Sequence, residues 1–126
     1  AACSVDNVVY VKFDVPVQPL VFDDSRLGTV TGGGFAVEDS GGIMTTSAYE
    51  AYGDMVKLTL SATPSGSTEV RCAIDYAGGG LPDASSRTGV STLRDSAPDT
   101  INVDGDTFHL YNPAPHFSLP VYAVEA

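Results

Sequence analysis

A period of two residues dominates the pattern of apolar and polar positions along this chain. It is clearest over residues 8–15, 54–61 and 68–76, where β-branched and aromatic side chains alternate with polar ones. Such alternation predicts half-buried β-strands. The side chains predicted to face inward are Val9, Val11, Phe13 and Val15; Val56, Leu58, Leu60 and Ala62; and Val70, Cys72, Ile74 and Tyr76. Residues 63–67 have the composition of a turn, so the second and third stretches are predicted to pair as a hairpin.

Weaker strand patterns fill most of the remaining chain. Short strands are predicted over 100–103 and 107–111, joined at Asp104-Gly105, a dipeptide typical of a type I′ turn. A last strand is predicted over 117–124, where Pro120 favours an edge position or a bulge. Residues 30–38 favour a weak, bulged strand, and residues 45–52 fit either a strand or a short helical turn. Residues 77–91 are rich in Gly, Pro, Asp and Ser, which predicts a long surface loop.

These elements define an expected fold class. No apolar pattern keeps a period of 3.6 residues over three turns, which argues against helices of ordinary length. About seven or eight short strands separated by turns predict an all-β fold, a single antiparallel β-sandwich. With 126 residues, one domain over 1–126 is expected, because a second domain would lack the residues for its own core.

Composition and charge narrow the classes of function. The chain holds 16 acidic and 6 basic residues, a formal net charge of -10. Affinity for phosphate groups rests on Lys and Arg, so nucleic acid and anionic membrane surfaces are excluded as partners. No run approaches the ~20 apolar residues that span a bilayer, so no membrane insertion is expected. Residues 1–6 lack the segments of a signal peptide, which was either removed or never present.

The chain has two cysteines, Cys3 and Cys72. In an extracellular protein they would form one bridge from the N-terminus to a central strand. The alternative is a buried, small apolar Cys72 and a terminal Cys3 thiol. Sequence spacing does not decide between the two.

Several phrases of the chain, taken in order, resemble a known module. Residues 9–17 and 55–66 resemble the opening strand and the hairpin of bacterial Ig-like modules. The later phrases resemble the C-terminal β-sandwich of phage, prophage and gene-transfer-particle proteins, which also ends some SGNH-type or sialate-esterase-like hydrolases. These phrases are Glu69-Val70-Arg71-Cys72-Ala73, Leu93-Arg94-Asp95-Ser96, Leu110-Tyr111-Asn112 and His116-Phe117-Ser118-Leu119-Pro120-Val121. The resemblance covers residues 8–121 and is weakest over 30–52.

The resemblance implies an Ig-like (Fn3-like) sandwich with an accessory role. In such proteins hydrolase chemistry belongs to a separate domain, and the sandwich is a spacer, an assembly contact or a sugar-binding surface. Asp106 and His109 do have the Asp-x-x-His spacing of SGNH hydrolases. A catalytic triad also needs a nucleophile, and the chain has no Gly-Asp-Ser block. The chain is therefore predicted not to be an enzyme.

A calcium site is the one cofactor that the sequence suggests. Asn102, Asp104 and Asp106 stand at i, i+2 and i+4, and their oxygen atoms suit Ca²⁺. Thr107 and Pro113 occupy the positions where an EF-hand needs Gly and Glu, so only a loop-type site fits. The alternative is a turn-forming Asp-Gly step with polar flanks.

The remaining candidates concern binding surfaces. The residues predicted to bind a partner on loops and turns are Asp83, Arg87, Asn102, Asp104, Asp106 and Tyr111. His109 and His116 have no established spacing of metal ligands. Tyrosines are available to stack on sugars, although the chain has no Trp. Arg94 and Asp95 are predicted to make structural bonds with each other or with loop backbone.

Two functions follow as hypotheses. The first is a structural or adhesion module of a phage or phage-like particle, such as a capsid decoration, head spike or tail fibre. Its partners would be other virion or parent-protein subunits, with cell-surface polysaccharide as a further ligand, and it would lie on the particle surface. The second is a carbohydrate-binding accessory domain of a larger secreted or phage-borne hydrolase. The two are compatible, since a spike both assembles and adheres.

Overall fold

The computed structural model describes residues 1–27, 31–73, 91–115 and 117–124. Over these residues the protein is all-β, with one helical turn α1 (Asp24–Leu27) and one 3-10 turn η1 (Thr31–Gly34). The strands are β1 (Ala2–Val5), β2 (Val8–Lys12), β3 (Val21–Phe22), β4 (Phe35–Asp39), β5 (Gly42–Met44), β6 (Thr46–Tyr52), β7 (Met55–Leu60), β8 (Thr68–Cys72), β9 (Leu93–Arg94), β10 (Thr100–Val103), β11 (Asp106–His109) and β12 (Phe117–Ala123). The all-β prediction is confirmed. No described helix is long and apolar enough to cross a bilayer.

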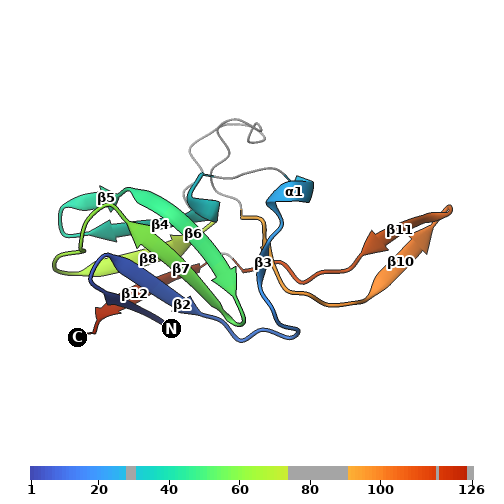
Figure 1. Ribbon diagram of the computed structural model, residues 1–126, viewed down its shortest axis with the longest axis horizontal. Helices are drawn as coiled ribbons and strands as arrows, with labels where there is room; N and C mark the ends of the chain where they lie inside the picture. Colours follow the sequence, from blue (N-terminus) through green and yellow to red (C-terminus); the bar gives the residue numbers. More distant parts are fainter. Residues whose placement is uncertain (28–30, 74–90, 116, 125–126) are drawn as a thin grey trace.

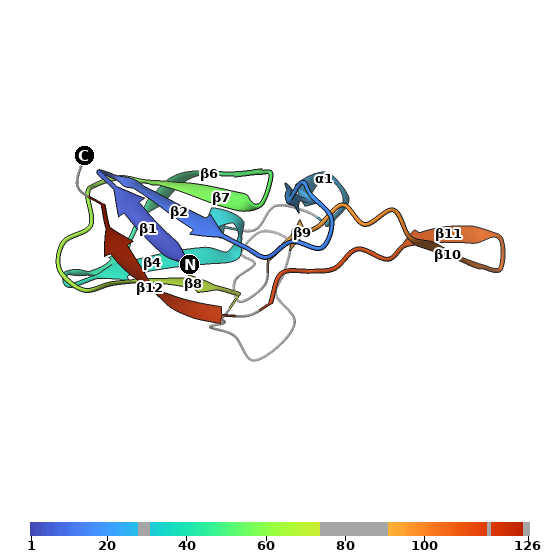
Figure 2. The same ribbon diagram turned by 90° about the horizontal axis from the view of Figure 1, so that it is seen from below.

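Eight strands form one sheet that curls on itself (Figures 1 and 2). Their order is β5-β4-β8-β12-β1-β2-β7-β6. The two edge strands, β5 and β6, are joined through the single residue Thr45, so the two edges of the sheet must lie close together. The result is a barrel-like body. The described residues form twelve strands in all, more than the seven or eight predicted. The body is also not purely antiparallel, because β1 pairs with β12 in parallel.

The inward faces of the curled sheet enclose one apolar cluster. Its members come from opposite parts of the sheet, for example Val9 of β2, Leu58 of β7 and Val70 of β8, all of them fully buried. The alternation predicted for these strands is therefore confirmed over the described residues, and Ile74 and Tyr76 lie outside them. Phe13 and Val15 also pack against the cluster from beyond the end of β2. Ala62 was predicted to face inward, but it lies exposed past the end of β7.

The predicted hairpin of residues 54–61 and 68–76 is wrong. β7 pairs with β2 and β6, whereas β8 pairs with β4 and β12. The segment between β7 and β8 instead bonds to the turn after β4, where Ser65 N–H donates to Asp39 Oδ2 at 3.0 Å and Ser40 Oγ donates to the Ser65 carbonyl at 2.7 Å. A turn-like composition marks a change of direction but does not name the next strand's neighbour.

Two further expectations change. Pro120 does not mark an edge, since β12 lies between β8 and β1 in the sheet. Pairing with β1 begins only at Val121, so at Pro120 the strand has β8 as its single neighbour and one side on which a missing N–H costs no hydrogen bond. Residues 45–52, left open between strand and helical turn, form strand β6.

The glycines at 32–34 form a packed turn rather than part of the predicted strand. Gly33 has φ 66, and a Cβ there would stand 2.7 Å from the Phe22 ring and 2.9 Å from the Tyr49 ring. Only glycine therefore fits beneath these two rings. The strand of this region starts later, at Phe35.

Four short strands lie outside the curled sheet. β3 and β9 form a two-stranded sheet at one end of the body, and β10 and β11 form another. The β10–β11 pair extends away from the body in both views (Figures 1 and 2). We call residues 99–110, which include this pair, the arm.

Candidate functional site

The arm is a β-hairpin with a two-residue turn. Thr100 pairs with His109 and Val103 with Asp106, leaving Asp104 and Gly105 in the turn. Both have positive φ, 51 and 88, as a type I′ turn requires. Asn102 Oδ1 accepts a hydrogen bond from Gly105 N at 3.1 Å and fixes the turn. The hairpin predicted at Asp104-Gly105 is confirmed.

The arm has one apolar face and one polar face. Cross-strand partners share a face, so Ile101 and Phe108 lie together, and Val103 and Leu110 follow on the same side. All four side chains are about half exposed, Phe108 at 52%. The opposite face carries Thr100, Asn102, Thr107 and His109. A strip of this size is comparable with the largest apolar patch that a typical monomer exposes, and such patches are often interaction sites.

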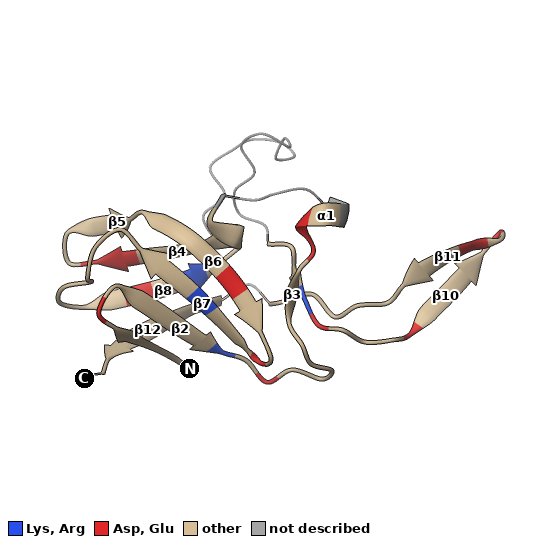
Figure 3. Cartoon of the chain, viewed as in Figure 1, with Lys and Arg blue, Asp and Glu red and all other residues tan. Residues whose placement is uncertain are grey.

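Acidic residues frame the apolar face. Asp99 stands across from Leu110, and Asp106 across from Val103, so each end of the apolar face carries a carboxylate. Asp104 adds a third at the turn. Figure 3 shows no Lys or Arg on β10 or β11. Indeed, no basic residue other than His follows Arg94 in the chain.

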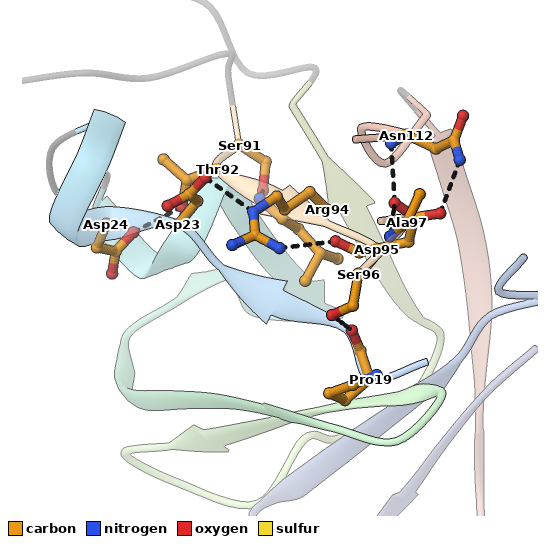
Figure 4. A network of polar contacts seen from close by, with 11 residues as sticks. Pro19, Asp23, Asp24, Ser91, Thr92, Arg94, Asp95, Ser96, Ala97 and Asn112 are labelled. Atoms are coloured by element: carbon orange, nitrogen blue, oxygen red, sulfur yellow. Dashed lines mark hydrogen bonds and ion pairs between the residues drawn. The ribbon is translucent and has the colours of Figure 1, made fainter. Parts of the chain in front are cut away.

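The segments that enter and leave the arm run side by side back to the body. Ala114 N donates to the Leu93 carbonyl at 3.0 Å, and Asp95 N to the Asn112 carbonyl at 3.1 Å. Ser96 continues this attachment, since its Oγ donates to the Pro19 carbonyl at 2.7 Å (Figure 4). We call residues 93–97 and 111–114 the stem.

Asp95 is the buried centre of the stem, with 2% of its surface exposed. Its carboxylate accepts hydrogen bonds from Asn112 Nδ2 at 2.7 Å, from Asn112 N at 2.9 Å and from Ala97 N at 3.2 Å (Figure 4). The side-chain bond from Asn112 is the main cause that lowers the pKa of Asp95 below 3.8, so the group stays ionised. A charged acceptor thus holds both segments of the stem together.

Arg94 joins the stem to the body and to the arm. Its Nε donates to Asp23 Oδ2 at 2.8 Å, and its Nη1 donates to the Asp95 carbonyl at 2.8 Å. Its guanidinium lies 3.6 Å from the centre of the Tyr111 ring. His109, on the arm, stacks on Tyr111 with 5.0 Å between ring centres. The structural bonds predicted for Arg94 and Asp95 are confirmed.

A second carboxylate, Asp24, connects two parts of the body next to the stem. Its two carboxylate oxygens accept hydrogen bonds, one from the Thr92 hydroxyl at 2.6 Å and one from the Tyr49 hydroxyl at 2.7 Å. Burial and the bond to Asp24 raise the pKa of Tyr49 to about 12. Since Tyr49 lies on β6 and Thr92 precedes β9, the bonds join the curled sheet to the small β3–β9 sheet. The arm is therefore attached to a part of the body in which hydrogen bonds join the two sheets.

The structure brings together only some of the predicted site residues. Asn102, Asp104 and Asp106 all lie exposed on the arm, whereas Tyr111 is part of the stem under Arg94. Asp83, Arg87 and His116 lie outside the described residues, as does the predicted loop apart from Ser91. Sequence reasoning missed the four apolar residues of the arm, although their alternation within the predicted hairpin was visible.

The side-chain oxygens of Asn102, Asp104 and Asp106 do not converge to form the predicted calcium site. Asn102 pairs with Thr107, and Asp106 pairs with Val103, which places Asn102 and Asp106 on opposite faces. Asn102 Oδ1 is also engaged by the turn. No group of three or more His, Cys, Asp or Glu able to hold a metal occurs among the described residues. The same alternation separates Asp106 from His109, so the Asp-x-x-His spacing does not form a catalytic pair here.

The two cysteines are free. Cys3 pairs with Tyr122 and Cys72 with Phe117, so they are two strands apart across the sheet and five residues apart along β12. That separation is roughly 15–20 Å, and a disulfide needs Cα atoms within about 7 Å. The bridged alternative is therefore wrong. Burial raises the pKa of the Cys72 thiol to about 11.

A shallow groove lies elsewhere on the body. Its volume is about 510 Å³. Its lining is mostly hydroxyl and carboxylate groups, from Glu38, Asp39, Ser40, Ser67, Thr68, Glu69, Ser118 and Pro120. It contains no aromatic side chain. It is therefore polar and open, unlike an apolar pocket for a small molecule.

Comparison with known proteins found no matching family model, no matching curated protein and no matching solved structure. The arm and its stem therefore provide the structural basis for a proposed function.

Proposed function

We propose that this chain is a non-enzymatic structural or adhesion module of a phage or phage-like particle, with an Ig-like (Fn3-like) body. It acts on the particle surface through contacts with other subunits. The observation that carries the proposal is the arm, which holds Ile101, Val103, Phe108 and Leu110 in water on a hairpin that projects from the body. The module resemblance in residues 69–121 supports the class of particle.

The stem supports a role in assembly. Assembly contacts need a surface held in one orientation, because loose elements lose more entropy on docking. Asp95 and Arg94 supply that rigidity through bonds of 2.7–3.2 Å to both stem segments and to Asp23.

Immunogold electron microscopy tests this function. Antibodies against the chain are applied to particles purified from the organism that encodes it, and labelling at regular positions is expected. The Ile101→Ser/Phe108→Ser chain, expressed in its place, should give unlabelled particles. Ile43→Ser is the matched control, since Ile43 is also exposed but lies on β5. Absence of the wild-type chain from every particle fraction would overturn the proposal.

Glycan binding, as an accessory domain of a secreted or phage-borne hydrolase, is the second candidate. The polar groove between β4, β8 and β12 favours it, because hydroxyls and carboxylates are the groups that bond to sugar hydroxyls. The lack of a ring in its lining argues against tight binding. Calorimetry with oligosaccharides, with and without Ca²⁺, decides this. Heat that is lost in Thr68→Ala and kept in Phe108→Ser would favour this function over docking.

A further inference from the structure

The arm lacks the cover that a two-stranded sheet normally needs. Within the part of the chain that the structure describes, β10 and β11 pair only with each other, and an isolated two-stranded hairpin is marginal in water. All eight residues of the two strands are exposed. A third surface packed on the apolar face would stabilise the arm.

The area of the face disfavours a second copy as the occupant. Four half-exposed side chains of this kind present on the order of 400 Å². Two arms stacked face to face would bury about that area on each chain, half of the ~800 Å² per partner of a standard interface. A groove that receives the face together with the open strand edges buries more.

Charge points in the same direction. Asp99 and Asp106 border the apolar face and Asp104 caps its tip, and the whole chain carries -10. Two arms in contact would bring six carboxylates together. Among the basic residues whose side chains the structure describes, Lys12, Arg71 and Arg94 are held in ion pairs within their own chain, and Lys57 lies across from Glu50 on the body. A partner that complements the arm must therefore carry cations beside an apolar surface.

We propose that the apolar face of the arm, residues 99–110, docks into an apolar groove of a different protein whose rim carries Lys or Arg. Ile101 and Phe108 fill the groove, and Asp99, Asp104 and Asp106 meet the cationic rim. This rests on the proposed function and names the chemistry of the partner subunit.

Three eight-residue peptides serve as probes: alternating valine and lysine, alternating valine and glutamate, and alternating serine and lysine. Amide chemical shifts of the isotope-labelled full chain report where each one binds. The valine–lysine peptide should shift residues 99–110 and bind at least about tenfold more tightly than the other two. The serine–lysine peptide measures attraction by charge alone.

Two variants separate the two parts of the interaction. Asp104→Asn/Asp106→Asn keeps the turn, because Asn tolerates the positive φ of residue 104, and should weaken binding about threefold to tenfold. Ile101→Ser/Phe108→Ser should lose binding to the arm. Ile43→Ser should bind like the wild type. The Asn variant tests the proposal even where the Ser variant loosens the hairpin.

Several outcomes would overturn this inference. The first is that the valine–glutamate peptide binds as tightly as the valine–lysine peptide, and the second is that the chemical shifts change only in β5 and β6. The third is that the chain binds phosphatidylcholine vesicles more tightly than it binds the valine–lysine peptide. The fourth is that the chemical shifts of the arm change with protein concentration in the absence of any peptide. The last would assign the face to a second copy. If the chain occurs on particles but does not bind the valine–lysine peptide, only the proposed chemistry of the partner is refuted. A chain that binds the peptide and occurs on no particle refutes the particle role alone.

Discussion

Asp95 shows how one buried carboxylate organises this end of the molecule. Its three accepted hydrogen bonds connect the segment that enters the arm with the segment that leaves it. Because the bonds favour the charged form, its pKa is lowered in the folded protein. Stability then depends on pH in a definite direction. The contribution is complete above 3.8, the ordinary value, and is lost as the pH falls through the lower folded value.

Removal of this carboxylate should destabilise the protein at neutral pH. Asp95→Ala leaves three donors without their acceptor, so the Tm should fall by several degrees at about pH 7. The difference from the wild type should shrink as the pH falls through the lowered pKa of Asp95, where the wild-type carboxylate becomes protonated too. Thermal unfolding followed by circular dichroism at a series of pH values measures this. Asp99→Ala, at an exposed position, is the control, and a difference that does not vary with pH would contradict the assigned role.

At the scale of the element, the arm depends on its turn. Gly105 has φ 88 and Asp104 has φ 51, and only the first lies where side chains other than glycine are strongly disfavoured. None of the described strands lies beside the hairpin to compensate for a poor turn. The two positions should therefore respond differently to substitution.

Gly105→Val should unfold the arm and leave the body intact. Strain of about 1–3 kcal/mol is enough to disorder a marginal hairpin. Nuclear Overhauser contacts between Ile101 and Phe108 should disappear, while the Tm of the body stays the same. Asp104→Asn should keep those contacts. Cross-strand contacts that survive in Gly105→Val would show that something other than the turn holds the arm together.

At the scale of the whole molecule, the body and the arm are stabilised separately. The buried apolar cluster is built from the curled sheet, β9 and the segments beside them, and it contains no residue of β10 or β11. The arm is instead held by the polar stem. The fold therefore places an exposed, acidic-rimmed hairpin on a body that does not need it for stability.

Excision of the arm tests this division. Residues 100–109 are replaced by Asn-Gly, which closes a two-residue turn between Asp99 and Leu110. The Tm should stay within about two degrees of the wild type, because no buried side chain is removed, whereas peptide binding should be lost. Leu58→Ala, a fully buried position, is the reference and should cost ~2–5 kcal/mol. A loss of comparable size on excision would mean that the arm supports the core.

Much of the local structure was predictable. Alternation located β2, β7 and β8 and the residues they bury, because a period of two is a property of each strand alone. Asp104-Gly105 located the arm's turn for the same reason, since positive φ is a local demand. The stem was half visible, in that Arg94 and Asp95 were expected to make structural bonds without their partners Asp23 and Asn112.

The tertiary structure decided which strands are neighbours. The curling of the sheet places β12 between β8 and β1, separates β7 from β8, and keeps Cys3 far from Cys72. It also decided that the hairpin of residues 100–109 stands in water, with its apolar face uncovered. Alternation tells which side chains share a face but not what covers that face, because cover comes from segments distant in the sequence. The sequence by itself therefore determined the strands, their faces and one turn. The tertiary structure determined which strands are neighbours and that the apolar face of the arm is exposed.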